Sequence, residues 1–288
     1  MVSTARRMGG SAVITNAGRG LGREVALLLA SKGYIIFGTA SSTDEVGDLR
    51  AASGGRVSLT VCDMTKAMLV EAWAGGVTEA LGAAGLNILV NNARILTQGP
   101  IEILPLDVIR HDIECNVIGA IAATNAFLPA LRTAHGRIVQ ISSWTAHLPI
   151  PFSGLSAASS AAMEVISAVY RAELKTCGVE VVVASIDDVT TASPERTAAA
   201  ARIAAAMTPG QRRLYGKAFV TAEDGLGMLA SGDLEPSAAA ARVVEIAVQR
   251  PSISRASVGS TAERMLRAAR EKPDAELDAL SLSLVGLS

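Results

Sequence analysis

Three serines stand at spacings that could build a catalytic site. Ser143 follows an apolar run, and Ser156 and Ser160 come thirteen and seventeen residues later in a segment rich in small residues. Residues four apart lie on one face of a helix, so Ser156 and Ser160 should face the same site. A serine hydroxyl has no useful acidity near neutral pH. These side chains could polarise a carbonyl, but they would not replace a general acid.

Two other side chains near this segment, His147 and Tyr170, have groups that can donate a proton. His147 lies four residues after Ser143 in a predicted loop. Its ring has a pKa in the useful range, so it is either a surrogate acid or an ordinary loop histidine. Tyr170 lies fourteen residues after Ser156 on the same predicted helix, about 21 Å along the axis. We therefore expect Tyr170 to pack against a neighbouring helix.

Strands and helices alternate through the first two thirds of the chain. The predicted strands are residues 11–15, 34–40, 56–62, 87–90, 137–141 and 179–185, and the predicted helices include 21–31, 66–84, 106–133 and one around Ser156. This alternation predicts an α/β fold, a Rossmann-like doubly wound parallel sheet with helices on both faces in three layers, α/β/α.

The remainder of the chain has a different pattern. Residues 192–233 form an alanine-rich helical segment without a strand signal, which we interpret as a lid over a substrate site. Helices are expected at 236–249 and 260–271, with an edge strand at 256–258 between them and a further helical tail from residue 272. No linker or repeat divides the chain, so residues 1–288 should form a single domain.

A glycine-bearing turn joins the first strand to its helix and reads Thr15-Asn16-Ala17-Gly18-Arg19-Gly20-Leu21-Gly22. Such a turn brings backbone close to a pyrophosphate at a helix N-terminus. The second strand ends near Ser41 without an acid before Asp44, whereas an acid there would hold the ribose 2′-hydroxyl of NAD. Arg19 could meet a 2′-phosphate or be a solvated cation. If a dinucleotide binds, NADP is therefore favoured over NAD.

These motifs together resemble the short-chain dehydrogenase/reductase (SDR) family, over about residues 11–258. The family's turn is T-G-x-x-x-G-x-G, and Asn16 stands at its first glycine, where asparagine tolerates left-handed backbone. Its catalytic serine, tyrosine and lysine fall by spacing on Ser143, Ser156 and Ser160. The continuation Ala161-Ala162-Met163-Glu164 fits the family, which supports this register.

The resemblance also implies roles for other residues. Asn116 would help relay protons, or else be a buried amide at a helix bend, and Asp63 would accept from the adenine amine or cap a helix. Asp187 stands where the family has glycine, and a buried Asp187 or Asp188 would need a partner, of which Arg94 is one candidate. The implied cofactor-binding set is Thr15, Asn16, Gly18, Arg19, Gly20, Leu21, Gly22, Ser41, Asp63, Met64, Asn91, Asn92, Ala93 and Thr191.

Segments 207–209, 214–216 and 256–262 look like the branch of the family that contains retinol and hydroxysteroid dehydrogenases. That branch takes bulky apolar alcohols and ketones under a helical lid. The resemblance also implies an assembly of the kind usual in the family. This would be a homodimer, a homotetramer, or a hetero-oligomer with a relative that retains the tyrosine and lysine.

Composition and charge limit the remaining possibilities. The formal net charge is −1, and no basic run extends beyond Arg6-Arg7, which argues against nucleic acid and an anionic membrane surface as partners. The uncharged run at residues 116–131 is short for a bilayer. The 3 cysteines are scattered and favour neither a metal site nor a disulfide framework. With no signal-peptide core at the start, we expect a soluble cytoplasmic protein.

Three hypotheses remain open from the sequence. The first is an NADP(H)-dependent SDR-like oxidoreductase for a bulky apolar ketone or alcohol, atypical or substrate-assisted, in which Ser143, Asn116 and His147 share the catalytic work. The second is a catalytically silent homologue that binds a ligand or a partner subunit. The third is a non-redox cyclase or isomerase that uses the space left by the missing phenol.

Overall fold

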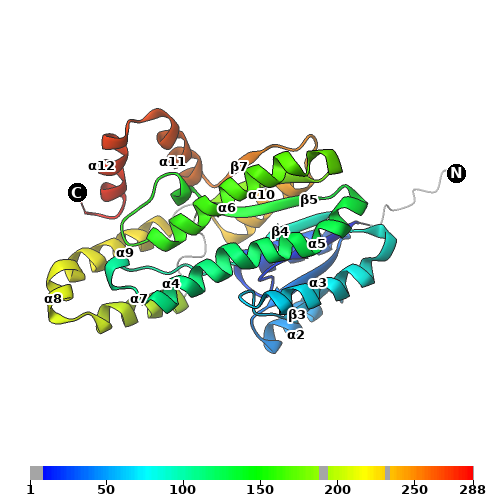
Figure 1. The fold of residues 1–288 in the computed structure, drawn as a ribbon, viewed down its shortest axis with the longest axis horizontal. Coiled ribbons are helices and arrows are strands. Elements are labelled where there is room, and N and C mark those ends of the chain that lie inside the picture. Colours follow the sequence, from blue (N-terminus) through cyan, green and yellow to red (C-terminus); the bar gives the residue numbers. More distant parts are fainter. Residues whose placement is uncertain (1–8, 188–193, 231–233, 288) are drawn as a thin grey trace.

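The computed structural model describes residues 9–187, 194–230 and 234–287, which form a parallel sheet between two layers of helices (Figure 1). The 7-stranded sheet has the order β3-β2-β1-β4-β5-β6-β7, and every neighbouring pair is parallel. The strands are β1 (Ser11–Ile14), β2 (Ile35–Ala40), β3 (Val57–Val61), β4 (Ile88–Asn91), β5 (Arg137–Ser143), β6 (Glu180–Ile186) and β7 (Arg255–Val258). The predicted doubly wound sheet is confirmed.

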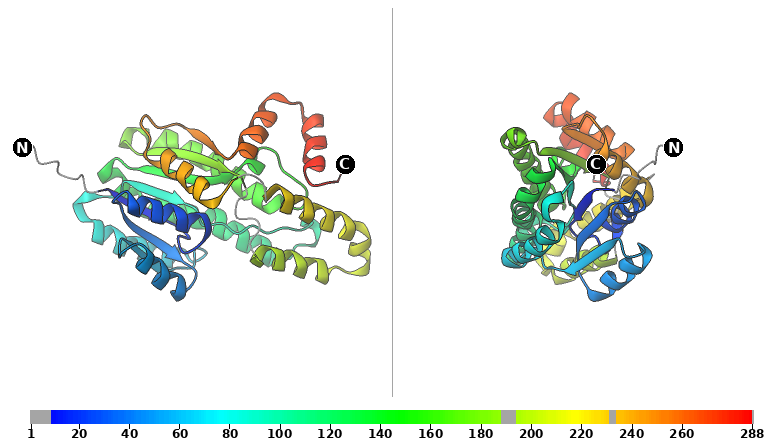
Figure 2. Two further views of the ribbon diagram at one scale, coloured as in Figure 1. Left: turned by 180° about the vertical axis from the view of Figure 1, so that it is seen from behind. Right: turned by 90° about the vertical axis from the view of Figure 1, so that its right-hand side faces the viewer.

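Alternating side chains of the strands supply a core on each face of the sheet. Ala12 and Ile14 pack with α1 (Gly20–Ser31) and α10 (Pro236–Val248), whereas Val13 points to the other face. There it meets Trp73 and Phe127 of the helices α3 (Ala67–Leu81) and α5 (Ala120–Ala134). Successive residues of a strand point to opposite faces, so a strand covered on both faces is apolar throughout. Figure 2 shows α1 and α10 together on the face opposite α3 and α5.

One helix beside the sheet was missed from the sequence. α2 (Thr43–Ala52) follows β2, and Ser42 caps it by accepting from the Glu45 amide at 3.4 Å. Its sequence is polar, and Leu49 is its one buried residue. A helix that buries so little has no apolar stripe for a periodicity argument to find.

The predicted helix over 106–133 is a continuous helical run with a change of pitch in the middle. α4 (Leu106–Ile113) passes through a π-helical turn, Glu114–Gly119, into α5. By length and composition alone, this run (Leu106–Ala134) could cross a membrane. Here its buried residues Ala123, Phe127 and Leu131 are part of the core beside the sheet, which makes it a core helix of this fold.

The segment after β6 is helical, as predicted. It contains α7 (Pro194–Ala206), α8 (Pro209–Gln211), a π-helical turn (Arg212–Gly216) and α9 (Lys217–Ala230), which extend beyond one end of the sheet (Figure 1). The predicted lid also included 192–193 and 231–233, which lie outside the described residues. α11 (Ser260–Glu271) and α12 (Asp274–Leu284) pack with α9 around Trp144 and Leu148.

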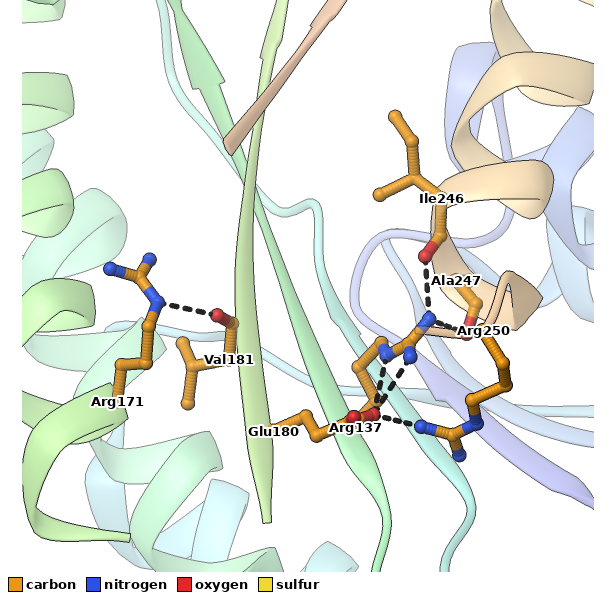
Figure 3. Close-up of polar contacts among 7 residues, drawn as sticks. All are labelled: Arg137, Arg171, Glu180, Val181, Ile246, Ala247 and Arg250. Atoms are coloured by element: carbon orange, nitrogen blue, oxygen red, sulfur yellow. Dashed lines mark hydrogen bonds and ion pairs between the residues drawn. The ribbon is translucent and has the colours of Figure 1, made fainter. Parts of the chain in front are cut away.

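A buried arginine joins α10 to the amino ends of the central strands (Figure 3). Arg137 opens β5 with 1% exposure and donates to Glu180 of β6 at 2.7 Å and 3.0 Å. The same guanidinium donates to the carbonyl oxygens of Ile246 and Ala247 at 2.8 Å and 2.9 Å, near the C-terminus of α10. A cation at that end satisfies carbonyl groups that have no partner within the helix.

Replacing Arg137 with methionine should lower the free energy of unfolding by about 3 kcal/mol, because the change leaves buried carbonyls and part of the Glu180 charge unpaired. Urea denaturation followed by circular dichroism measures the loss. Arg242→Met is the matched control: Arg242 forms an exposed pair with Glu245 on the same α10, so its loss should cost less than about 1 kcal/mol. Equal costs for the two variants would contradict the assigned anchoring role.

Candidate functional site: a dinucleotide pocket and a serine-lined helix

The turn after β1 is tied to the segment that follows β4. The Thr15 hydroxyl oxygen accepts from the backbone amides of Asn92 and Ala93 at 2.9 Å and 2.8 Å. The Asn92 side chain donates to the carbonyl oxygens of Thr15 and Asn16 at 3.0 Å and 3.1 Å. The two loops therefore form one rigid rim at the carboxyl ends of β1 and β4.

The backbone of this turn has the conformation expected from the resemblance. Asn16 has φ 52° and Gly20 also has φ 52°, so the asparagine holds the left-handed position that a glycine would otherwise occupy. A Cβ on Gly22 would collide with the carbonyl oxygen of Asn16. The first turn of α1 carries no acidic residue, and Arg19 makes no side-chain cap. The free backbone amides in the first turn of α1 can therefore bind an anion.

A pocket of about 410 Å³ opens beside this turn. It brings together six of the predicted cofactor-binding residues, namely Asn16, Arg19, Ser41, Asp63, Met64 and Ala93. Side chains that sequence reasoning did not place there also line it, among them Arg94, Ile95 and His111. The Asn16 Oδ1 atom is buried without a hydrogen-bond donor in the described part of the chain. These features fit a nucleotide that supplies both a donor and phosphate groups.

Other members of the predicted set support the pocket without lining it. Leu21 is 3% exposed and lies in the core. The Asn91 side chain donates to Thr124 and Gln140 at 2.9 Å and 3.2 Å, away from the pocket lining. These contacts give Asn91 a structural role, and its part in cofactor binding stays a prediction. Thr191 lies outside the described residues.

Asp63 shapes the edge of the pocket through a local turn. Its carboxylate accepts from the amide and hydroxyl of Thr65 at 2.9 Å and 2.8 Å. The Thr65 amide hydrogen bond, followed by that of the hydroxyl, lowers the pKa of Asp63. The N-cap of α3 is Lys66, so Asp63 forms an Asx turn instead of capping that helix.

Asn116 lies in the π-helical turn, and both the oxygen and the nitrogen of its side chain have partners within the protein. Oδ1 accepts from the Ile95 amide at 2.7 Å, while Nδ2 donates to the Ile95 carbonyl at 2.8 Å. Nδ2 also lies 2.8 Å from Asp112 and 3.1 Å from Ser159. An amide nitrogen has two hydrogens for these three acceptors. Asn116 therefore has the contacts of a buried amide in a helical turn, and its role in proton relay stays a prediction.

Asp112 was missed from the sequence. It is 0% exposed, and burial raises its pKa despite hydrogen bonds from Thr97 and the nearby charge of Arg94. The signal that could have found it is the four-residue spacing to Asn116, which places both side chains on one helix face.

The three candidate serines, Ser143, Ser156 and Ser160, are all buried. Ser143 ends β5 at 0% exposure, and its Oγ accepts from the amide and hydroxyl of Thr145 at 3.2 Å and 2.9 Å. Ser156 and Ser160 lie in α6 (Gly154–Glu173) with 7% and 6% exposure. Within residues 9–187, 194–230 and 234–287, neither of these two side chains makes a hydrogen bond.

His147 belongs to a charged cluster around Glu164, and its role as a surrogate acid stays a prediction. Its Nε2 lies 2.6 Å from Glu164, a residue of α6 with 4% exposure. Arg255 of β7 contacts both side chains and lies 2.6 Å from Glu164. Ser142 and Ser185 donate to the other Glu164 oxygen at 2.7 Å and 3.3 Å. Glu164 lies four residues after Ser160 on α6, so this cluster continues the helix face that carries Ser156 and Ser160.

Asp187 finds its partners at the start of α11. Its carboxylate accepts from the backbone amide of Thr261 at 3.2 Å and from that of Ala262. A carboxylate at a helix N-terminus satisfies free amides and interacts favourably with the helix dipole. Asp187 thus holds α11 against the end of β6. The other acid considered as a partner of Arg94, Asp188, lies outside the described residues.

Changing Gly22 to alanine should lower dinucleotide affinity at least tenfold, because the added Cβ meets the Asn16 carbonyl and moves the turn. It should also cost about 1–3 kcal/mol of stability. Gly47→Ala is the control, since a Cβ there meets open space within α2. That control should gain up to about 1 kcal/mol. Calorimetric titration and thermal unfolding test the pair, and unaltered binding by the Gly22 variant would count against this turn as the phosphate site.

The Glu164 cluster should make stability depend on pH. Burial by itself raises the pKa of Glu164, but hydrogen bonds from His147 and Ser142 and the charge of Arg255 outweigh it, so the pKa lies below its usual range. The stabilisation is then present above the unfolded pKa of about 4.3 and is lost as pH falls through the lower folded value. Glu164→Gln should be less stable by about 3 kcal/mol at pH 7 and lack this acid-side loss. Glu173→Gln, exposed on the same helix, should follow the wild-type profile in urea titrations between pH 3 and 7.

Comparison with known proteins agrees with the geometry. The sequence profile of the short chain dehydrogenase family matches residues 11–201. Rat estradiol 17-beta-dehydrogenase 2 is 34% identical over 174 residues, which is 59% of this chain and 45% of that protein. Mouse mitochondrial D-beta-hydroxybutyrate dehydrogenase is 30% identical over 206 residues, or 67% of this chain and 60% of that protein. The chain thus spans about half the length of these curated relatives.

Solved structures share the fold over nearly the whole chain. A short-chain dehydrogenase from Streptomyces avermitilis has a TM-score of 0.77 at 23% identity, covering 97% of this chain and 98% of its own. A short-chain dehydrogenase from Burkholderia cenocepacia, solved with NADP, has a TM-score of 0.70 at 21% identity, covering 96% and 97%. With the matched profile, the parallel sheet and the glycine turn pointing to one conclusion, this chain belongs to the short-chain dehydrogenase family.

Proposed function

We propose that the protein is a nicotinamide-dinucleotide-dependent oxidoreductase that interconverts a bulky apolar alcohol and ketone without the family's usual tyrosine and lysine. The observation that carries this proposal is the preserved pocket beside β1 and β4. Its turn has the required left-handed Asn16, a Gly22 position that admits no side chain, and an uncapped helix start.

The residues around the pocket fit the dinucleotide by their chemistry. Arg19, Ser41, Asp63 and Met64 would hold the adenosine half, and the first turn of α1 would meet the pyrophosphate. When bound, the nicotinamide supplies the hydride. Arg19 supports NADP(H), and NADP is present in the Burkholderia cenocepacia structure. An NADPH-dependent 3-dehydrocapnine reductase from Ornithobacterium rhinotracheale, 29% identical over 59% of this chain and 62% of its own, adds support.

Ser143 is the residue best suited to polarise a substrate carbonyl. Its oxygen already accepts two hydrogen bonds from Thr145, so its own proton is left to donate. Accepting those bonds in a buried site also strengthens the hydroxyl as a donor. Ser156 and Ser160 offer hydroxyls on one helix face but no acidity, so the proton must come from the substrate or from water.

An apolar substrate is supported by the helices beyond the sheet. Ala200, Met207 and Phe219 of the lid segment pack with Ile103 and Phe152 of the loops at this end of the sheet. The relatives with the highest identity among those described include an estradiol dehydrogenase, whose name denotes a bulky apolar alcohol. A lid of this composition excludes water and favours such a ligand.

The silent homologue is the second candidate, and the Asn116 arrangement favours it. Every hydrogen-bonding group of that side chain is engaged by Ile95, Asp112 and Ser159. A chain that lacks an acidic phenol and holds its relay amide this tightly could still bind a dinucleotide and a ligand without turnover.

Restoring the missing pair separates the two candidates. Ser156→Tyr combined with Ser160→Lys should raise the rate of an active wild type by about 10²–10⁴, the usual contribution of a general acid. The measurement is NADPH and NADH consumption at 340 nm over a panel of apolar ketones, after dinucleotide binding has been measured by fluorescence titration. Ser156→Phe with Ser160→Lys is the control, because it fills the same space without a phenolic hydroxyl.

Each result assigns a function. Slow wild-type turnover that rises only with the phenol supports the oxidoreductase. Dinucleotide binding without wild-type turnover, followed by activity in the restored variant, supports the silent homologue. No binding of either dinucleotide at millimolar concentration refutes the proposal.

A further inference from the structure

Glu45 places a carboxylate against two residues that line the dinucleotide pocket. It is the third residue of α2, yet its side chain turns back toward the preceding strand. Glu45 Oε2 accepts from the Ser41 backbone amide at 2.8 Å, and its Oε1 lies 3.9 Å from Arg19 Nε. The Glu45 side chain is 18% exposed and lies against Gly18. Sequence reasoning found no acid at the end of β2, but the fold supplies one from the next helix.

The carboxylate uses the two donors that a 2′-phosphate would need. Ser41 and Arg19 both line the pocket, Ser41 directly after the end of β2 and Arg19 directly before α1. A phosphate placed there would carry its own negative charge against Glu45, and like charges at close range repel each other strongly when they are partly desolvated. A ribose 2′-hydroxyl could instead donate a hydrogen bond to the same carboxylate.

We propose that Glu45 is a specificity-determining residue that closes the 2′-phosphate subsite and thereby favours NAD(H) over NADP(H). This inference rests on the proposed function, because it requires a dinucleotide in the pocket. Arg19 alone would favour NADP(H), and Glu45 opposes that preference by pairing with Arg19 and occupying the Ser41 amide. NADP(H) then binds only after the Glu45 side chain has left this position, whereas NAD(H) binds with it in place.

A capping role for Glu45 is the alternative explanation. The residues Ser42 to Glu45 form a Ser-x-x-Glu pattern, and such a glutamate commonly satisfies a backbone amide at a helix start. The two explanations differ in what the charge does. Glutamine keeps an oxygen that accepts from the Ser41 amide, so Glu45→Gln removes the charge while it preserves the cap.

The experiment measures dissociation constants of NAD⁺ and NADP⁺ by calorimetry for the full-length wild type and for Glu45→Gln. The expected result is a rise of about tenfold in NADP⁺ affinity relative to NAD⁺, because a like charge next to the 2′-phosphate has been removed. Asp48→Asn is the matched control. Asp48 lies on the same helix and pairs with Arg23 at 3.2 Å, so it removes an equal charge away from Ser41 and Arg19.

A second probe, 2′-AMP, tests the subsite without the nicotinamide half. It should bind Glu45→Gln about tenfold more tightly than the wild type, for the same electrostatic reason. If neither dinucleotide binds but 2′-AMP still discriminates between the two proteins, the proposed function fails and the role of Glu45 stands. A ratio of NADP⁺ to NAD⁺ affinity that stays within about twofold in Glu45→Gln overturns the inference. An equal shift in Asp48→Asn overturns it as well, since the effect would then belong to the net charge of α2.

Discussion

The structure of this site depends on a buried carboxylate, that of Glu164. A charge with 4% exposure is tolerated only where partners replace water, and here they come from four different elements. Ser142 belongs to β5, His147 to the following loop, Ser185 to β6 and Arg255 to β7. All of these partners can contact Glu164 only when its carboxylate is in one position. They therefore fix the rotation of α6 about its axis and its position along the sheet. Ser160 and Ser156 lie one and two turns before Glu164, so the same cluster decides where those hydroxyls point.

The two halves of the site have diverged to different degrees. On the adenosine side, Asn16 replaces a glycine and still takes the left-handed backbone, and Asn92 ties the turn to its neighbour. On the other side, the changes are accompanied by new contacts. Asp187 caps α11, and Asp112 together with Ser159 holds Asn116. These residues are therefore built into the packing of the site.

The same molecule contains opposing influences on cofactor choice. Arg19 is a cation beside the pocket, and Glu45 is an anion that reaches it from α2. Neither charge determines selectivity by its residue type alone, since each partly neutralises the other at this distance. The balance depends on the short connection between β2 and α2, which brings the carboxylate back over Gly18 and the Ser41 amide.

Local physical rules were sufficient for much of the fold. Strands covered on both faces must be apolar, which made the alternating pattern and the parallel sheet predictable, and the left-handed tolerance of asparagine made Asn16 predictable. The polar helix α2 has no apolar stripe, so the hydrophobic periodicity of the sequence did not predict it. The roles of Glu45, His147, Asp187 and Asn116 could not be derived in the same way. Each depends on which backbone amide or charge from another element lies beside it, and contacts such as those between Glu164 and Arg255 join residues far apart in the chain. The sequence by itself determined the layers and the turn, whereas only the tertiary structure decided the partners of the charged and polar side chains, because those partners meet only when separate elements pack together.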